Sequence, residues 1–268
     1  MYEEYSRTLS ETELQQYLNR IGIAEKKEPT LSFLDELILA HQLTVPFETL
    51  DSSLFHKNPD IDTDTLFQKI VVNRRGGYCF ELNSLFTRLL LALGFDAYSC
   101  FAKVVRGKDM SAPILLLHRL NMIRLSDGLY LCDVGYGGPM PACAIPVRDG
   151  ASRTCLGETF RSVKSCDPWW FLARTTSTGE AENVLMYYPM PQSDADFIPM
   201  NLFASEDPRS IFTQKVMANL RTIRGNISLT DFELTIRSGN LVEMQCIASS
   251  SERDEVLKKY FSIATNCG

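Results

Sequence analysis

Two consecutive glycines at positions 76–77, followed at once by a cysteine and a long amphipathic run, constrain this chain more than any other segment. Apolar side chains recur near a 3.6-residue period from Phe80 onward, which predicts a helix over 79–93 that Gly94 ends. The glycines predict a tight turn just before this helix. Cys79 then lies in the first helical turn, where the positive end of the helix dipole favours the nucleophilic thiolate. The alternative is that Cys79 is a small buried hydrophobic residue.

Length and composition predict a globular protein that binds neither nucleic acid nor a membrane. At 268 residues and 45% hydrophobic content, the chain can bury a large core and hold two or three subdomains. The net charge of -6 argues against nucleic acid and anionic membrane surfaces as partners. Because there is no apolar signal core at the N-terminus and no apolar run near the roughly 18 residues of a membrane span, we expect a cytoplasmic protein. The basic residues that could gather around an anionic ligand, or simply form a solvated face, are Arg74, Arg75, Lys103, Arg106 and Lys108.

The eight cysteines do not indicate a metal site. No two of them are spaced C-x-x-C, which disfavours a structural zinc site or a thioredoxin-like motif, and we expect no metal. In the cytoplasm the thiols stay reduced, so most of these cysteines are expected to fill the core. Cys100 and Cys132, which lie in strand-like runs, fit that role.

Helix signals dominate the first 94 residues, and strand signals follow them. A capping-box pattern begins at Ser10 and predicts a helix that runs to about Ile21 and ends at Gly22. Periodic apolar residues predict further helices over 31–43 and 62–72. Strands are expected over 95–105, 114–124 and 129–133, and more short strands over 144–185. A polar stretch over 188–199 could mark a boundary. After it we expect a helix over 211–220, a hairpin over 229–242 and a helix over 253–261.

A cysteine nucleophile needs a histidine that moves the proton and a third group that orients the histidine. The sequence contains three histidines: His41 on a predicted helix, His56 in a polar loop and His118 in an apolar strand. A lone histidine in an apolar strand is usually a core residue, but Asp133 ends the next predicted strand and could orient the His118 ring. Cys79, His118 and Asp133 are therefore the candidate catalytic residues.

The register of one hairpin decides whether this histidine and this aspartate meet. Residues directly opposite each other in an antiparallel pair lie on the same face, roughly 5 Å apart. His118 and Asp133 are opposite if the hairpin is centred between residues 125 and 126. A two-residue turn at 127–128 would instead place Asp133 opposite Met122, and we would expect the triad to fail. The sequence leaves this register open.

Four motifs in order resemble the arylamine N-acetyltransferase family over nearly the whole chain. Two of them are Arg75-Gly-Gly-Tyr-Cys-Phe-Glu-x-Asn83 and Asp133-Val-Gly-Tyr-Gly137, with His118 between them, 39 residues after Cys79 and 15 before Asp133. The others are His41-Gln-x-x-Val-Pro-Phe-Glu48 and the late run Asp196-Phe…Asn201-x-Phe-x-Ser205-x-x-Pro-x-Ser-x-Phe212. The chain departs from the family at Thr49, where asparagine is usual, and at Tyr136, where phenylalanine is common.

The resemblance implies an α+β fold with a cysteine-peptidase-like core. The implied parts are an N-terminal helical bundle over 1–94 that carries the nucleophile, a central antiparallel β-barrel-like domain over 95–195 that carries the histidine and aspartate, and a C-terminal α/β lid over 196–268. By the same resemblance, Arg75 and Glu48 support the active-site loop, Phe47, Tyr136 and Phe203 line the amine pocket, and Gly135, Gly137 and Gly138 meet the coenzyme.

The implied activity is ping-pong transfer of an acetyl group from acetyl-coenzyme A through an acetylated Cys79. The implied acceptors are arylamines and arylhydrazines, with O-acetylation of arylhydroxylamines as a further reaction, in xenobiotic metabolism or biosynthesis. The expected partners are these small molecules, and the expected state is a monomer or homodimer. The same triad also serves peptidases, amide synthases and other acyltransferases, which stay open as alternatives, as does a binding protein that kept the fold.

Overall fold

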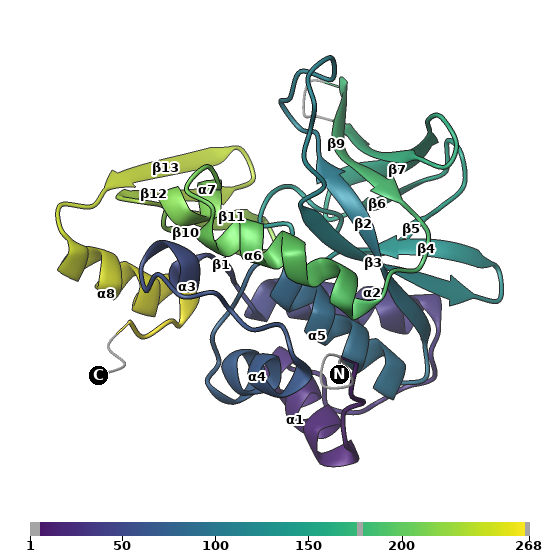
Figure 1. Ribbon diagram of the computed structural model, residues 1–268, viewed down its shortest axis with the longest axis horizontal. Helices are drawn as coiled ribbons and strands as arrows, with labels where there is room; N and C mark the ends of the chain where they lie inside the picture. Colours follow the sequence, from purple (N-terminus) through teal and green to yellow (C-terminus); the bar gives the residue numbers. More distant parts are fainter. Residues whose placement is uncertain (1–5, 176–178, 266–268) are drawn as a thin grey trace.

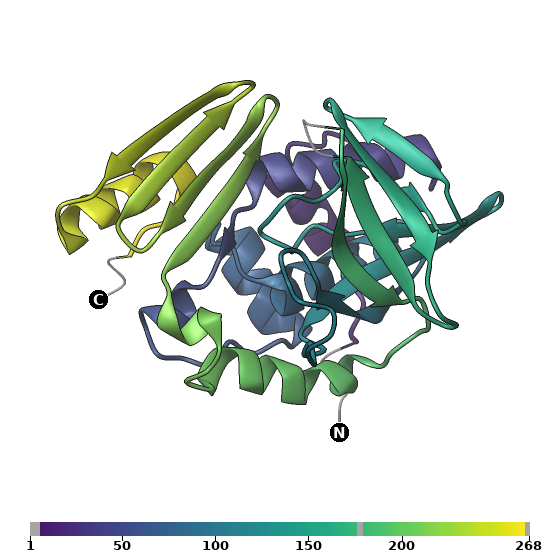
Figure 2. The same ribbon diagram turned by 90° about the horizontal axis from the view of Figure 1, so that it is seen from above.

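The computed structural model describes residues 6–175 and 179–265, and within them helices are combined with two antiparallel sheets (Figure 1). The helices of the first half of the chain lie between the two sheets when the molecule is seen from above (Figure 2). This arrangement confirms the expected α+β class. In the described part of the chain, no helix is long and apolar enough to cross a membrane.

The N-terminal helices follow the capping and periodicity signals of the sequence. The Ser10 side chain accepts a hydrogen bond from the Glu13 amide at the start of the first helix, and Gly22 ends that helix in the left-handed conformation. The last turn of the helix predicted over 62–72 is a π-helix. The elements are α1 (Glu11–Ile21), α2 (Leu31–Thr44), α3 (Leu50–Ser53), α4 (Thr63–Phe67), η2 (Gln68–Val72) and α5 (Cys79–Ala92).

Helix α5 forms the centre of the main hydrophobic core. Its first twelve residues are all buried, and its apolar side chains pack with those of α1, α2 and the first strands of the larger sheet. A helix that is apolar around most of its circumference is expected in such a central position. The start of α5 is therefore held on several sides, which fixes the position of Cys79.

The larger sheet has eight antiparallel strands in the order β5-β4-β3-β2-β9-β8-β7-β6. It curls so far that its edge strand β5 contacts β6 and β7, which makes it a nearly closed barrel. The stretch 114–117, which we expected in a strand, lies outside it. The strands are β2 (Asp96–Val104), β3 (His118–Leu125), β4 (Gly128–Cys132), β5 (Ile145–Pro146), β6 (Ser152–Cys155), β7 (Glu158–Lys164), β8 (Trp170–Thr175) and β9 (Ala181–Tyr188).

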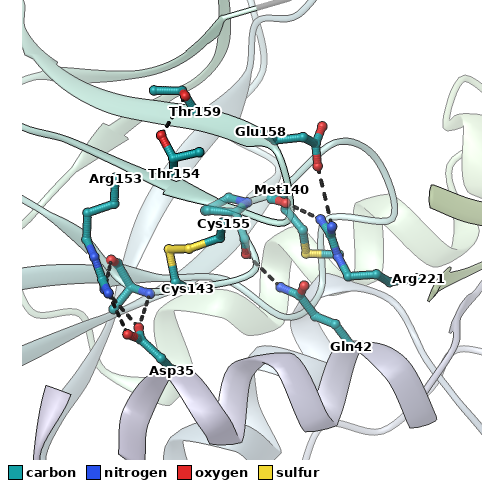
Figure 3. The surroundings of a disulfide bond; sticks show 12 residues. Asp35, Gln42, Met140, Cys143, Arg153, Thr154, Cys155, Glu158, Thr159 and Arg221 are labelled. Atoms are coloured by element: carbon teal, nitrogen blue, oxygen red, sulfur yellow. Dashed lines mark hydrogen bonds and ion pairs between the residues drawn. A yellow bond between two sulfur atoms is a disulfide. The ribbon is translucent and has the colours of Figure 1, made fainter. Parts of the chain in front are cut away.

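A disulfide between Cys143 and Cys155 joins the two edges of this sheet (Figure 3). Cys143 lies just before β5 and Cys155 ends β6, and the Cα atoms are 6.3 Å apart. The expectation that the thiols are reduced is wrong for this pair, because sheet closure brings together two cysteines whose spacing gave no signal. Beside the disulfide, Arg153 forms an ion pair of 2.6 Å with Asp35 of α2. The free cysteines in the described residues are the buried Cys79, Cys100 and Cys132 and the exposed Cys166 and Cys246.

The smaller sheet has the order β1-β10-β11-β12-β13 and packs against the last helix. The predicted helix over 211–220 is wrong, since only one short turn forms before a strand begins. The predicted hairpin over 229–242 belongs to four consecutive antiparallel strands. The helix expected near the C-terminus is confirmed. The elements are β1 (Phe47–Glu48), α7 (Ile211–Gln214), β10 (Met217–Thr222), β11 (Gly225–Thr230), β12 (Glu233–Ser238), β13 (Leu241–Cys246) and α8 (Ser250–Phe261).

A helical stretch that was not predicted begins inside the segment read as a polar boundary and runs beyond its end. It comprises a 3-10 turn, η3 (Asp194–Phe197), which leads directly into α6 (Ile198–Glu206). Proline near the first turn of α6 is compatible with a helix start, so Pro199 did not exclude a helix there. In Figure 2, α6 runs along one side of the molecule from the barrel toward the smaller sheet.

Candidate active site

Cys79 is the first residue of α5 and is buried, with its Sγ atom 3.9 Å from the Leu117 carbonyl oxygen. The two glycines before it are required by close contacts. A Cβ atom on Gly76 would lie 2.0 Å from the Pro46 carbonyl oxygen, and one on Gly77 would lie 2.7 Å from a carboxylate oxygen of Glu81. The glycines thus let the start of α5 approach the β1 segment and the carboxylate that caps this helix.

His118 and Asp133 form a hydrogen bond of 2.7 Å between Nε2 and Oδ2. His118 begins β3 and Asp133 follows β4, and both side chains are buried. The strands turn at Ser126 and Asp127, so the register pairs Asn121 with Cys132, and neither hairpin considered from the sequence is present. Extended by one residue, this register places Asp133 opposite Leu120, which makes His118 its diagonal neighbour. The expectation that the triad needs a directly opposed pair is therefore wrong.

The ionisation of His118 reflects two negative partners. Burial lowers the pKa of the imidazole, but the charges and hydrogen bonds of Asp133 and Cys79 outweigh this effect and raise the pKa to about 10. With Nε2 bonded to Asp133, the Nδ1 atom is the ring nitrogen left for the Cys79 sulfur. The three candidate catalytic residues thus meet, and the partners of His118 favour the protonated form of its ring.

The other two histidines lie apart from this site. His41 is fully buried on α2, its Nε2 atom is 3.0 Å from the Tyr17 hydroxyl, and burial lowers its pKa to about 3. It is a neutral core histidine. His56 is exposed in a loop.

Two amides that the sequence analysis did not single out hold Asp133 in place. The Asn83 Nδ2 atom on α5 donates to Asp133 Oδ1 over 2.9 Å and to the Arg119 carbonyl over 2.7 Å, while Asn83 Oδ1 accepts from the Val134 amide. Gln42 of α2 donates to the Asp133 carbonyl over 3.0 Å. Both residues stand within the family-like motifs, which was the signal that could have identified them.

The glycine-rich loop after Asp133 packs directly on the cysteine and on β1. A Cβ atom on Gly135 would lie 2.9 Å from the Cys79 Cα atom. Gly137 has a φ of +74°, and a Cβ atom there would lie 2.5 Å from the Phe47 ring. The Tyr136 ring lies edge-on to the His118 ring, with centroids 5.7 Å apart. These glycines therefore keep the loop close to the triad.

Arg75 and Glu48 belong to a cluster of buried charges beneath the cysteine turn. Arg75 forms ion pairs of 2.7 Å with Glu48 and 3.0 Å with Asp51, and Lys69 forms pairs of 2.5 Å with Asp51 and Glu81. Glu81 also accepts a hydrogen bond from the Tyr78 amide at the start of α5. Burial and the neighbouring carboxylates raise the pKa of Glu81 above its usual value despite Lys69. The cluster braces the turn that carries Cys79.

Of the three predicted pocket aromatics, two lie beside the triad. Phe47 contacts the glycine-rich loop and has its ring centroid 6.3 Å from that of Phe212, while Tyr136 contacts His118. Phe203 lies on α6 under the Arg209 guanidinium, and within residues 6–175 and 179–265 no ring contact joins it to Phe47 or Tyr136. Helix α6 contacts the site through a different residue. The Asn201 side chain accepts a hydrogen bond of 2.5 Å from the hydroxyl group of Tyr78, the residue before Cys79.

A cavity of about 770 Å³ opens between the barrel and the smaller sheet. The glycine-rich loop forms one wall through Gly137 and Gly138. Of the five basic residues that the sequence offered as an anion cluster, only Arg106 lines this cavity, where it pairs with Glu182 at 2.8 Å. Arg74 and Lys108 are exposed, and Lys103 lies over the Trp169 ring. The other charged residues of the cavity wall are Glu158, Arg174, Arg221, Arg224 and Arg237.

The side chains of the site do not suggest a metal centre. In the described ranges no group of three His, Cys, Asp or Glu residues has a geometry that could hold a metal ion. The carboxylate and imidazole of the triad instead bond to each other.

Comparisons with known proteins match this chain over most of its length. A profile of the N-acetyltransferase family matches residues 30–267. The chain is 30% identical to an arylamine N-acetyltransferase of Mycobacterium tuberculosis over 254 residues, 94% of this chain and 89% of that protein. It is 28% identical to the arylamine N-acetyltransferase / N-hydroxyarylamine O-acetyltransferase of Salmonella typhimurium, with the same coverage of 94% and 89%. The solved structure of the Mycobacterium marinum arylamine N-acetyltransferase in complex with CoA is similar with a TM-score of 0.87 and 27% identity, covering 93% of this chain and 92% of that one.

Proposed function

Because the chain belongs to the arylamine N-acetyltransferase family, we propose that this acyltransferase moves an acetyl group from acetyl-coenzyme A to arylamines through an acetylated Cys79. The observation that carries the proposal is the buried hydrogen bond of 2.7 Å between His118 and Asp133 beside the cysteine sulfur. This arrangement suits a nucleophile, a proton carrier and an orienting carboxylate.

In the first half-reaction, the Cys79 thiolate attacks the carbonyl carbon of the thioester. A carbon–sulfur bond forms to Cys79, and the carbon–sulfur bond to coenzyme A breaks. The departing coenzyme A thiolate takes the proton of the His118 imidazolium, which leaves a neutral imidazole. The cysteine then carries the acetyl group, and the charges of both the thiolate and the imidazolium are neutralised.

In the second half-reaction, a neutral arylamine attacks the acetyl-cysteine. An aromatic amine is weakly basic, so its nitrogen is uncharged at neutral pH. His118 accepts the proton that the nitrogen loses, and the bond from the carbonyl carbon to Cys79 breaks. The amide leaves and the thiolate–imidazolium pair is restored. Asp133 stays ionised throughout and holds the ring.

The negatively charged oxygen of each tetrahedral intermediate needs a hydrogen-bond donor. The Cys79 backbone N–H is at the first position of α5, where helix amides have no partner within the helix. The same helix end contributes a positive partial charge. We therefore assign the oxyanion to this amide.

The two substrates approach from different sides of the triad in this proposal. The flat ring of the amine packs against Phe47 and Tyr136, with Phe212 behind. Coenzyme A occupies the basic cavity, where Gly137 and Gly138 let its chain approach and the arginines neutralise its phosphates. The complex of the Mycobacterium marinum protein with CoA supports this choice of donor.

Several finer properties belong to the same proposal. Arylhydrazines are included as acceptors because their terminal nitrogen is also a neutral nucleophile, and the name of the Salmonella typhimurium relative supports O-acetylation of hydroxylamines. We further propose the three domains 1–94, 95–195 and 196–268, the last as a lid, around a cysteine-peptidase-like core. A cytoplasmic location and a monomer or homodimer stay predictions.

The acetylated cysteine is the testable core of the mechanism. The protein is incubated with acetyl-coenzyme A alone, and the intact mass and the modified peptide are determined by mass spectrometry. We expect one acetyl group on Cys79, its loss when an arylamine is added, and no acetylation of Cys79→Ala. Cys166→Ala, which removes an exposed thiol, is the matched control and should behave like the wild type. An enzyme that turns over fully without Cys79 would refute the proposal.

A further inference from the structure

The Cys143–Cys155 disulfide joins two segments that form part of the wall of the cavity described above. Residues 156–158, which follow Cys155 directly and lead into β7, all line this cavity. Met140, three residues before Cys143, lines it as well. The bond therefore connects the wall segment that precedes β5 with the wall segment at the turn between β6 and β7 (Figure 3).

Arg221 of β10 connects the same two segments to the smaller sheet. Its guanidinium donates a hydrogen bond to the Met140 carbonyl and forms an ion pair of 3.4 Å with Glu158 (Figure 3). Arg221 also lines the cavity, and only 11% of its side chain is exposed. The position of this side chain thus depends on two acceptors, which come from the two segments that the disulfide keeps together.

Arg153 provides a second connection between the two edges of the barrel sheet. In the ranges that the structure describes, β5 and β6 are not joined by strand pairing. Arg153 of β6 donates to the Ala144 carbonyl over 2.8 Å and pairs with Asp35 at 2.6 Å. These contacts do not involve the sulfur atoms, so they stay when the disulfide opens. Reduction then removes the covalent anchor of the 156–158 segment while β6 stays attached to the barrel.

A small thiol can reach the disulfide from the side of Cys155. Cys143 is buried, whereas Cys155 is half-buried. A dithiol attacks the Cys155 sulfur, and Cys143 departs as a thiolate that takes up a proton. The second sulfur of the dithiol then displaces Cys155, which also becomes a thiol. The S–S bond of the protein is thereby broken, and the dithiol is oxidised to a cyclic disulfide.

We propose that Arg221 is a positioning residue for coenzyme A, and that the disulfide makes this positioning sensitive to reduction. The inference rests on the proposed function, since it takes this cavity as the coenzyme site. In the oxidised protein, the Met140 carbonyl and the Glu158 carboxylate fix the guanidinium in the cavity wall. In the reduced protein, the 156–158 segment is freer to move, and the coenzyme has to order it on binding. Acetyl-coenzyme A therefore binds the oxidised protein more tightly.

The test follows the single-turnover acetylation of Cys79 by rapid-quench mass spectrometry at increasing concentrations of acetyl-coenzyme A. Each protein is measured oxidised, and again after reduction with dithiothreitol and desalting. Peptide mass spectrometry establishes the state of the disulfide, and circular dichroism establishes that the protein is folded. A variant without the two exposed free thiols is the matched control, because it keeps the disulfide. The proteins are the wild type, Cys143→Ser/Cys155→Ser, Arg221→Met and the control Cys166→Ser/Cys246→Ser.

The proposal predicts a change in affinity without a change in chemistry. Reduction of the wild type should raise the half-saturating concentration of acetyl-coenzyme A about tenfold, the effect of ordering one or two side chains on binding. The maximum rate of acetylation should stay the same. Cys143→Ser/Cys155→Ser should match the reduced wild type in both conditions. Arg221→Met should bind weakly and equally in both conditions, since the side chain that the disulfide positions is absent. The control should respond to reduction like the wild type.

A purely structural disulfide would give a different pattern. Its reduction would lower the resistance of the wild type to urea and leave the half-saturating concentration unchanged, and that result overturns the inference. A reduced wild type that does not fold overturns it as well, because the proposed effect requires a folded reduced protein.

Full sensitivity to reduction in Arg221→Met overturns the role of Arg221. If this variant does not fold, Arg221→Lys replaces it, because lysine keeps the charge but lacks the planar fork that serves two acceptors. The proposed function fails separately, through an oxidised wild type in which Cys79 is not acetylated at any concentration of the donor.

Discussion

Replacing Asn83 by leucine tests whether Asp133 is held by the helix that carries the nucleophile. The Asn83 side chain is fully buried and makes three hydrogen bonds, to Asp133 Oδ1, to the Arg119 carbonyl and to the Val134 amide. Leucine has a similar volume but makes none of them. Among the described residues, the Gly135 amide, at 2.8 Å, is then the one donor left to Asp133 Oδ1.

The expected effects follow from these contacts. Three buried hydrogen bonds at about 1 kcal/mol each predict a loss of roughly 3 kcal/mol in the free energy of unfolding. A hydrogen bond to a charged group contributes about 1.5–3 kcal/mol, and losing the one to Asp133 loosens the carboxylate that orients His118. At 1.36 kcal/mol per factor of ten, we expect the acetylation of Cys79 to slow by roughly 10- to 100-fold.

Asn121→Leu is the matched control for this variant. Asn121 is also fully buried, and its side chain also makes three hydrogen bonds, to the Thr87 hydroxyl, the Ser99 hydroxyl and the Asn83 carbonyl. None of them reaches Asp133. The control should lose a similar unfolding free energy and keep a rate of acetylation within about threefold of the wild type.

Urea denaturation gives the unfolding free energies, and rapid-quench mass spectrometry with acetyl-coenzyme A gives the single-turnover rate of Cys79 acetylation. If Asn83 acts by holding Asp133, the two variants have similar unfolding free energies and different rates of Cys79 acetylation. Equal losses of rate in both variants would show that general loosening of the core is responsible. An unchanged rate in Asn83→Leu would show that Asp133 needs no support from α5.

Three further predictions concern parts of the fold around the site. The double variant Cys143→Ser/Cys155→Ser should lose about 3 kcal/mol of unfolding free energy in urea under oxidising conditions, and dithiothreitol should bring the wild type to the same value without changing the variant. Since the pKa of His41 falls from 6.5 in the unfolded chain to about 3 in the folded one, its contribution to stability is present above pH 6.5 and is lost as the pH falls toward 3. His41→Gln should therefore flatten the acid side of a stability–pH curve by about 1.4 kcal/mol per pH unit. Gly137→Ala should lower the unfolding free energy by about 1–3 kcal/mol and raise KM for arylamines in steady-state assays, because its Cβ atom would meet the Phe47 ring.

The sequence predicted best those elements whose signals are local. The capping box at Ser10, the αL glycine at position 22 and the apolar period of α5 each act within one or two helical turns, so the helices formed where expected. The helix wrongly predicted over 211–220 contains a short helical turn and then alternating residues of β10. That strand exists because it pairs with β1 and β11, and neither partner is visible from the segment itself.

Features that depend on contacts between distant segments could not be predicted from the sequence. The Cys143–Cys155 disulfide needs the closure of an eight-stranded sheet, which no spacing of cysteines encodes. The sharing of Asp194 by Arg88 and Arg119 joins three segments that are far apart in the sequence. Such contacts are set by tertiary packing, whereas Cys79 and Asp133 could be found because each stands inside a local motif, and His118 because it is one of only three histidines in the sequence.

The contact between His118 and Asp133 shows that direct opposition across two antiparallel strands is too strict a criterion for a catalytic pair. Directly opposed residues do share a face, but so do diagonal neighbours two positions along, and an imidazole is long enough to span that distance. With a two-residue turn at 126–127, the diagonal arrangement also puts His118 at the first residue of β3 and Asp133 just past the end of β4. Both side chains are then at the open end of the hairpin, where the first turn of α5 can reach them. The observed register, which lies between the two that the sequence suggested, leaves room for a nucleophile and an acyl donor.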